Sequence, residues 1–96
     1  MANSVSLGVG VDAGSAHTRS IVLRLEGSRL RYLGHGDVES LGWSKGRIAD
    51  PQALSVCVQA SVRHAEEEAK TPVDSVTAGI GWSVQSFDNR GTYEFA

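Results

Sequence analysis

The residues best suited to chemistry lie in residues 9–18, which read Val-Gly-Val-Asp-Ala-Gly-Ser-Ala-His-Thr. Asp12 ends an alternating apolar stretch, and Gly14 and Ser15 follow it in the arrangement Asp-x-Gly-Ser. A glycine at position 14 can take a backbone angle that other residues resist, and it lets a phosphate approach the main chain. Successive backbone N–H groups and the Ser15 hydroxyl can then surround an anion. The segment predicts a phosphate-binding loop, with an ordinary hairpin turn as the alternative.

Asp12 is also a candidate metal ligand. Mg²⁺ usually keeps several waters and takes one or two carboxylates, so Asp12 at the end of a strand could hold this ion through water. The alternation around it predicts that strand: Val5, Leu7, Val9 and Val11 are apolar, and Ser6, Gly8, Gly10 and Asp12 lie between them. Because Gly8 and Gly10 have no side chains, we expect a helix or backbone to approach that face closely.

The elements after the loop complete an α/β pattern. Residues 20–25 and 29–38 predict two further strands joined by a short turn at 26–28, with Leu30, Tyr32 and Gly34 sharing a face. Residues 39–49 predict a loop, and Asp50-Pro51 predicts a helix start. An apolar stripe at helical spacing follows, and Thr71-Pro72 ends the helix. The stripe consists of Leu54, Cys57, Val58, Val62, Ala65 and Ala69.

Residues 75–80 predict a fourth strand, which a right-handed crossover would place parallel to the first. Phe87, Tyr93 and Phe95 suggest another extended piece. The order β-β-β-α-β with a mixed sheet is typical of an incomplete ribonuclease-H-like half domain. The sheet edges and one sheet face are therefore expected to be poorly covered.

Composition narrows the classes of function. The 96 residues have a formal charge of −2, which provides no basic surface for nucleic acid and no polybasic patch for an anionic membrane. The N-terminal residues have no signal-peptide pattern, and the apolar runs are too short to span a membrane. A single cysteine, Cys57, excludes an internal disulfide and agrees with a cytoplasmic location.

Other reactive side chains have simpler interpretations. Cys57 is expected in the core, because free cysteine is often buried. The three histidines are assigned to different elements, so a zinc site is not expected. The acidic run 66–68 is interpreted as a solvated helix face rather than as the carboxylates of a two-metal nuclease. Lys45 and Arg47 are interpreted as loop residues or as contacts to another subdomain.

Several segments resemble a known family. The Asp-x-Gly-Ser loop in a β-β-β-α-β run looks like the first phosphate loop of actin-like and sugar-kinase-like ATPases. A closer resemblance over nearly the whole chain is to the FtsA family of bacterial cell-division proteins. The residues that resemble that family are Val9–Ser15, Leu33–Gly36, Gly42–Asp50, Val76–Gly81 and Ser86–Gly91.

The resemblance implies ATP and Mg²⁺ as cofactors of the complete protein. Asp12 would lie near Mg²⁺, and Gly14, Ser15 and Ala16 would face the β- and γ-phosphates. His17 would also line the site, where the family usually has a lysine. Neutral imidazole is a poorer phosphate partner than ammonium. Trp82 and Ser83 also depart from the pattern that follows Gly81.

The family is an actin-like ATP-binding scaffold that anchors the FtsZ polymer to the inner face of the cell membrane and self-associates. The resemblance implies a partial nucleotide-binding subdomain over 1–84 and the start of an inserted, SHS2-like subdomain over 85–96. It also implies a fragment that by itself neither hydrolyses ATP nor binds it appreciably. The alternatives are a small-molecule kinase of the pantothenate- or sugar-kinase type, or another actin-like assembly protein of the pilus or ethanolamine-compartment type.

Overall fold

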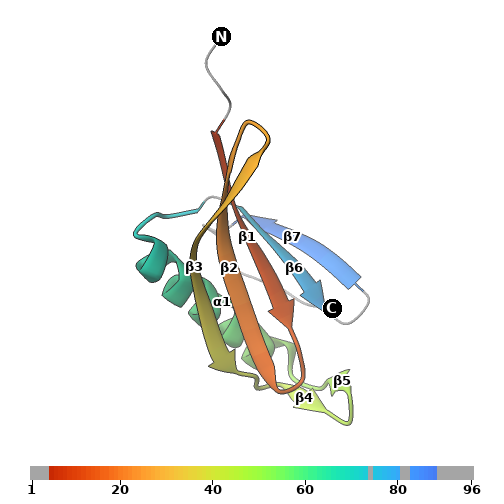
Figure 1. The fold of residues 1–96 in the computed structure, drawn as a ribbon. Helices are drawn as coiled ribbons and strands as arrows, with labels where there is room; N and C mark the ends of the chain where they lie inside the picture. The colour runs from red at the N-terminus through yellow and green to blue at the C-terminus, as the bar shows by residue number, and fades with distance from the viewer. Residues whose placement is uncertain (1–4, 74, 81–82, 89–96) are drawn as a thin grey trace.

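A computed structural model describes residues 5–73, 75–80 and 83–88, and Figure 1 shows their arrangement. One long helix lies against one face of a sheet in which five strands are hydrogen-bonded side by side. Along the chain the elements are β1 (Val5–Ala13), β2 (His17–Glu26), β3 (Arg29–Glu39), β4 (Trp43–Ser44), β5 (Arg47–Ile48), α1 (Pro51–Ala69), β6 (Ser75–Ile80) and β7 (Ser83–Asp88).

The sheet has the strand order β3-β2-β1-β6-β7. β1, β2 and β3 form an antiparallel meander, and β6 runs parallel to β1 on its other side. The predicted meander and the parallel fourth strand are therefore confirmed, as is the α/β class with a mixed sheet. β7 pairs antiparallel with β6 and contains Phe87, whereas Tyr93 and Phe95 lie outside the described residues.

The helix begins and ends where the sequence predicts. The Asp50 carboxylate accepts hydrogen bonds from the amides of Gln52 and Ala53, and Pro51 occupies the first turn. Lys70 adopts a left-handed conformation with φ 55° and ends the helix one residue before Thr71. The predicted stripe faces the sheet: Leu54, Val58, Val62 and Ala65 are buried with Cys57, and Ala69 is half-buried. Cys57 is thus a core residue, as expected.

The core lies between α1 and the sheet. On β1, Val9, Val11 and Ala13 are buried and face the helix. The opposite sheet face has no cover among the described residues, and its apolar side chains include Ile21 at 42% and Leu25 at 42% exposure. This agrees with the expected poorly covered face.

The glycines that allow close packing are in β3 and not in β1. A Cβ built on Gly10 or on Gly8 would meet no atom within 4 Å, so the expected close approach at that face is wrong. A Cβ on Gly34 would lie 2.7 Å from the amide nitrogen of Ala69, and one on Gly36 would overlap the carbonyl oxygen of Ser61. The side chains missing from β3 therefore let the helix backbone lie directly on that strand.

Two local features differ from the sequence-based expectation. A register shift between β2 and β3 leaves Leu33 as an extra residue, so Tyr32 is exposed while Gly34 is buried under α1. The expected shared face of Tyr32 and Gly34 is therefore wrong, because a bulge interrupts strict alternation. The predicted loop 39–49 contains the small β4–β5 hairpin, in which Lys45 and Gly46 both have positive φ.

Candidate functional site

The candidate site centres on the turn between β1 and β2, which consists of residues 14–16 and lies at one end of the sheet (Figure 1). The Gly14 amide donates to the His17 carbonyl at 3.0 Å and closes the turn. Ser15 and Ala16 are exposed, and their amides have no hydrogen-bond acceptor within the described part of the chain. Two adjacent free N–H groups at a solvent-facing turn are suited to binding an anion.

A side chain at position 14 would be crowded. A Cβ at this position would lie 3.1 Å from the His17 carbonyl oxygen, closer than an ordinary van der Waals contact. The φ of Gly14 is not in the left-handed region, unlike that of Gly27, Gly42 and Gly46. The expectation that Gly14 supplies an unusual backbone angle is therefore wrong, because the hydrogen bond from the Gly14 amide to the His17 carbonyl closes the turn without a positive φ at Gly14.

Asp12 lies beside the turn on the open face of the sheet. Asp12 is exposed. Its neighbour Ala13, the last residue of β1, is buried and faces the helix, so the Asp12 side chain lies on the opposite face. Its partner in β6 is Gly79, and its partner in β2 is Arg19. A solvent-facing carboxylate next to an anion-binding turn has the chemistry to hold a hydrated Mg²⁺ that also contacts a phosphate.

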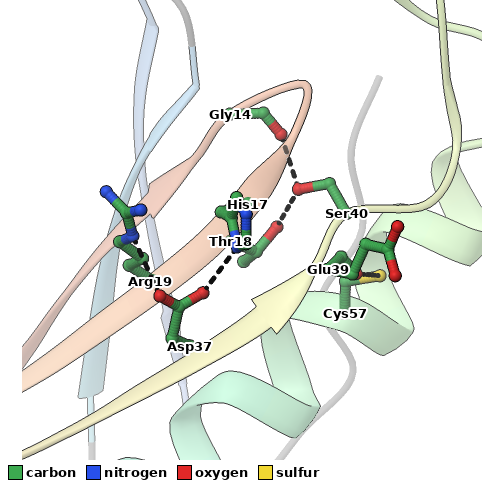
Figure 2. Close-up of polar contacts among 8 residues, drawn as sticks. All are labelled: Gly14, His17, Thr18, Arg19, Asp37, Glu39, Ser40 and Cys57. Atoms are coloured by element: carbon green, nitrogen blue, oxygen red, sulfur yellow. Dashed lines mark hydrogen bonds and ion pairs between the residues drawn. The ribbon is translucent and has the colours of Figure 1, made fainter.

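His17 is the first residue of β2 and is held by the neighbouring strand. Its Nδ1 donates to the Asp37 carboxylate at 2.9 Å, and Arg19 Nε donates to the other oxygen of Asp37 at 3.1 Å (Figure 2). The hydrogen bond from His17 is the main reason that the pKa of Asp37 lies below its ordinary value; partial desolvation opposes it, and the hydrogen bond and charge of Arg19 add to the lowering. The His17 imidazole is therefore hydrogen-bonded to the Asp37 carboxylate beside the turn.

Ser40 holds the turn from the far end of β3. Its Oγ donates to the Gly14 carbonyl at 2.6 Å, and its amide donates to the Ala16 carbonyl at 2.9 Å. Its hydroxyl also lies 2.8 Å from the hydroxyl of Thr18, which is fully buried under the helix. Figure 2 shows Ser40 between Gly14 and Thr18. Sequence reasoning did not identify Ser40, because it lies 26 residues from Gly14 and belongs to no motif.

The helix fixes the chain on both sides of Ser40. Cys57 Sγ donates to the Glu39 carbonyl at 3.6 Å and accepts from the Leu41 amide at 3.2 Å. Cys57 is 5% exposed, and both contacts are part-buried. The segment that carries Ser40 is thereby tied to α1 as well as to the turn.

A second polar cluster joins β3 to the end of α1. The Tyr32 hydroxyl donates to Glu68 Oε1 at 3.0 Å and also hydrogen-bonds His35 Nδ1, while the His35 amide donates to the same Glu68 oxygen at 3.3 Å. The Tyr32 hydrogen bond, followed by the one from the His35 backbone, lowers the pKa of Glu68. Desolvation, followed by the hydrogen bond and charge of Glu68, raises the pKa of Tyr32. This cluster shares no residue with the turn.

The structure brings the predicted site residues to one end of the sheet, with some in the turn and others on the flanking strands. Gly14, Ser15 and Ala16 form the turn itself, whereas Asp12 and His17 lie on the strands that flank it. Within residues 5–73, 75–80 and 83–88, no three His, Cys, Asp or Glu side chains are grouped to hold a metal ion. No helix in the same residues is long and apolar enough to cross a membrane.

No protein-family model matches the chain. The chain is similar to the cell division protein FtsA of Enterococcus hirae, with 28% identity over 81 residues. That match covers 84% of this chain and 18% of the relative, so the chain spans less than a fifth of the protein that it resembles. The chain therefore has an FtsA-like sequence in an α/β fold.

Proposed function

We propose that this chain provides part of the nucleotide-binding region of an FtsA-like cell-division scaffold. The observation that carries the proposal is the match to FtsA of Enterococcus hirae over 81 residues. The exposed turn at residues 14–16, with free amides at Ser15 and Ala16, supports a phosphate-binding role for it. The β-β-β-α-β order supports an incomplete actin-like half domain over residues 1–84. The start of an inserted SHS2-like subdomain over 85–96 is proposed from the resemblance to the family alone.

In this proposal the complete protein binds ATP with Mg²⁺ as a structural and assembly ligand. The amides of Ser15 and Ala16 would hold phosphate oxygens, and Asp12 would hold Mg²⁺ through water. Asp12 fits this ion, because Mg²⁺ prefers hard oxygen ligands and the Asp12 carboxylate is exposed beside the turn. Mg²⁺ would supply positive charge to the phosphates, and the turn would orient them.

The cellular role proposed for the complete protein is to attach an FtsZ-type polymer to the inner face of the cell membrane and to self-associate there. The small-molecule kinase alternative shares the Asp-x-Gly-Ser loop. It receives no additional support from the described residues. This chain alone is expected to contribute one wall of the nucleotide cleft, with no ATP hydrolysis and with affinity weaker than micromolar.

The proposed phosphate role is tested by titrating the ¹⁵N-labelled chain with MgATP and following the backbone amide chemical shifts. The largest shifts are expected at Ser15 and Ala16, and the turn at Gly27 and Ser28, at the opposite end of β2, serves as the internal control. Asp12→Asn is expected to remove the Mg²⁺ dependence of the shifts, because an amide is a weaker ligand than a carboxylate. Unchanged shifts at residues 14–16 would contradict the role. Micromolar affinity measured by calorimetry would contradict the one-wall expectation.

A further inference from the structure

We propose that Ser40 is the positioning residue that shapes the turn at 14–16 for a phosphate, an inference that rests on the proposed function of that turn. Ser40 contacts the turn twice, through its side chain to the Gly14 carbonyl and through its amide to the Ala16 carbonyl. These are the carbonyls of the first and last residues of the turn. Ser40 itself does not need to touch the ligand.

The two hydrogen bonds from Ser40 change how the turn interacts electrostatically with a phosphate. A phosphate is attracted by N–H groups and repelled by carbonyl oxygens, and a turn this short presents both within a few ångströms. Ser40 donates to the carbonyls of Gly14 and Ala16, while the amides of Ser15 and Ala16 stay free toward solvent. The turn is thereby fixed with its donors available and two of its acceptors neutralised.

The hydroxyl geometry also sets the direction of donation. Because Ser40 Oγ donates its hydrogen to Gly14 at 2.6 Å, its 2.8 Å contact with the Thr18 hydroxyl is donated by Thr18. Thr18 is fully buried, so this hydroxyl needs a partner and finds one in Ser40. The resulting chain Thr18–Ser40–Gly14 consists of part-buried hydrogen bonds that strengthen one another.

The position of Ser40 is itself determined by the helix. Cys57 hydrogen-bonds the backbone of Glu39 and of Leu41, the residues on each side of Ser40. Fixing both neighbours restricts the backbone of Ser40, so its hydroxyl reaches the turn without a large loss of conformational freedom on binding. The turn is therefore organised before a ligand arrives.

The test titrates the ¹⁵N-labelled chain with sodium tripolyphosphate and Mg²⁺ at fixed ionic strength, with the Ser15 and Ala16 amides as the signal. Ser40→Ala is expected to weaken binding by at least about fivefold, since one organising hydrogen bond is worth about 1 kcal/mol. Ser40→Thr keeps the hydroxyl and is expected to bind within about twofold of the wild type. Ser28→Ala, in the exposed turn at the other end of β2, is the matched control and is expected to bind like the wild type.

Two measurements separate positioning from general stability. The urea unfolding midpoint of each variant is recorded, and Ser40→Cys, which keeps a γ atom but donates weakly, is expected to reproduce the loss seen with alanine. Wild-type affinity in Ser40→Ala or Ser40→Cys would overturn the positioning role and leave the phosphate role intact. Equal losses in Ser40→Thr and Ser40→Ala would also overturn it. No shift at Ser15 and Ala16 in the wild type would overturn the phosphate role and this inference together.

Discussion

His17 is the first residue of β2 after the turn, and its side chain contacts Asp37 on the neighbouring strand. The side chain of His17 is 51% exposed and that of Asp37 is 39% exposed, so both partners of this pair contact solvent. The pair therefore affects the charge beside the turn much more than it affects the stability of the fold. An anionic Asp37 close to the turn disfavours a bound phosphate unless the Arg19 guanidinium compensates its charge.

This arrangement predicts a pH-dependent effect at a single residue. His17→Phe is expected to raise the pKa of Asp37 toward its ordinary value, because the hydrogen bond from His17 is the largest cause of its lowering. The folded-state pKa lies below the unfolded value, so the stability contributed by Asp37 is present above the unfolded pKa. It is lost as the pH falls through the folded pKa. A ¹³C titration of the Asp37 carboxyl group measures the shift.

The matched control is His64→Phe, which removes an exposed histidine on α1 and is expected to leave the Asp37 titration unchanged. An Asp37 titration that is identical in His17→Phe and the wild type would show that the His17 contact does not persist in solution. Because the hydrogen bond from Arg19 remains in His17→Phe, the pKa of Asp37 is expected to rise but to stay below its ordinary value.

At the scale of elements, the contact between α1 and β3 depends on glycine. The helix lies across β2 and β3 so closely that its own backbone contacts the strand at Gly34 and Gly36. In the buried interface the Ser61 hydroxyl donates to the Val58 carbonyl at 2.9 Å and accepts from the Ser20 hydroxyl, 2.5 Å away. The small side chains of β2, β3 and α1 at this interface are therefore a packing requirement.

Gly36→Ala and Gly10→Ala are expected to change stability in opposite directions. A Cβ on Gly36 overlaps the Ser61 carbonyl, so α1 must move, and overpacking of this kind costs about 1–3 kcal/mol. A Cβ on Gly10 meets no atom within 4 Å, and replacing a strand glycine by alanine stabilises by about 0.5–1 kcal/mol. Urea unfolding measures both. Equal effects of the two substitutions would contradict the described packing of α1 on β3.

The strands and the helix were predictable because their signals are local. Alternation over residues 5–12 and the Asp50-Pro51 start depend on neighbours in sequence, and β6 was predicted with its observed bounds. The closely packed glycines were assigned to β1 instead of β3, because the sequence does not state which strand lies under the helix. The β4–β5 hairpin was missed, because its strands have only two residues each.

The candidate site was predictable in part. The motif located the turn, but the motif alone could not show that its carbonyls are bound by Ser40 or that His17 pairs with Asp37. Both contacts join residues at least 20 positions apart through pairing of β2 with β3. Such contacts depend on the register of the strands, and the register includes a bulge that no residue pattern indicated.

For the molecule as a whole, the proposed function requires that this chain can take the place of the corresponding part of FtsA. The similarity covers 84% of this chain but 18% of the relative, so most of the relative has no counterpart here. The open sheet face and the exposed turn are surfaces that the rest of such a protein is expected to complete. A chimera therefore tests the function in the setting where the proposal places it.

The most direct measurement is the ATP affinity of Enterococcus hirae FtsA in which this chain replaces the matching segment, together with its ability to support division in cells depleted of FtsA. We expect the chimera to bind MgATP and to restore division, and the same chimera with Asp12→Asn to bind MgATP more weakly. A folded, membrane-associated chimera that neither binds MgATP nor restores division would contradict the proposed nucleotide-binding role in an FtsA-like scaffold.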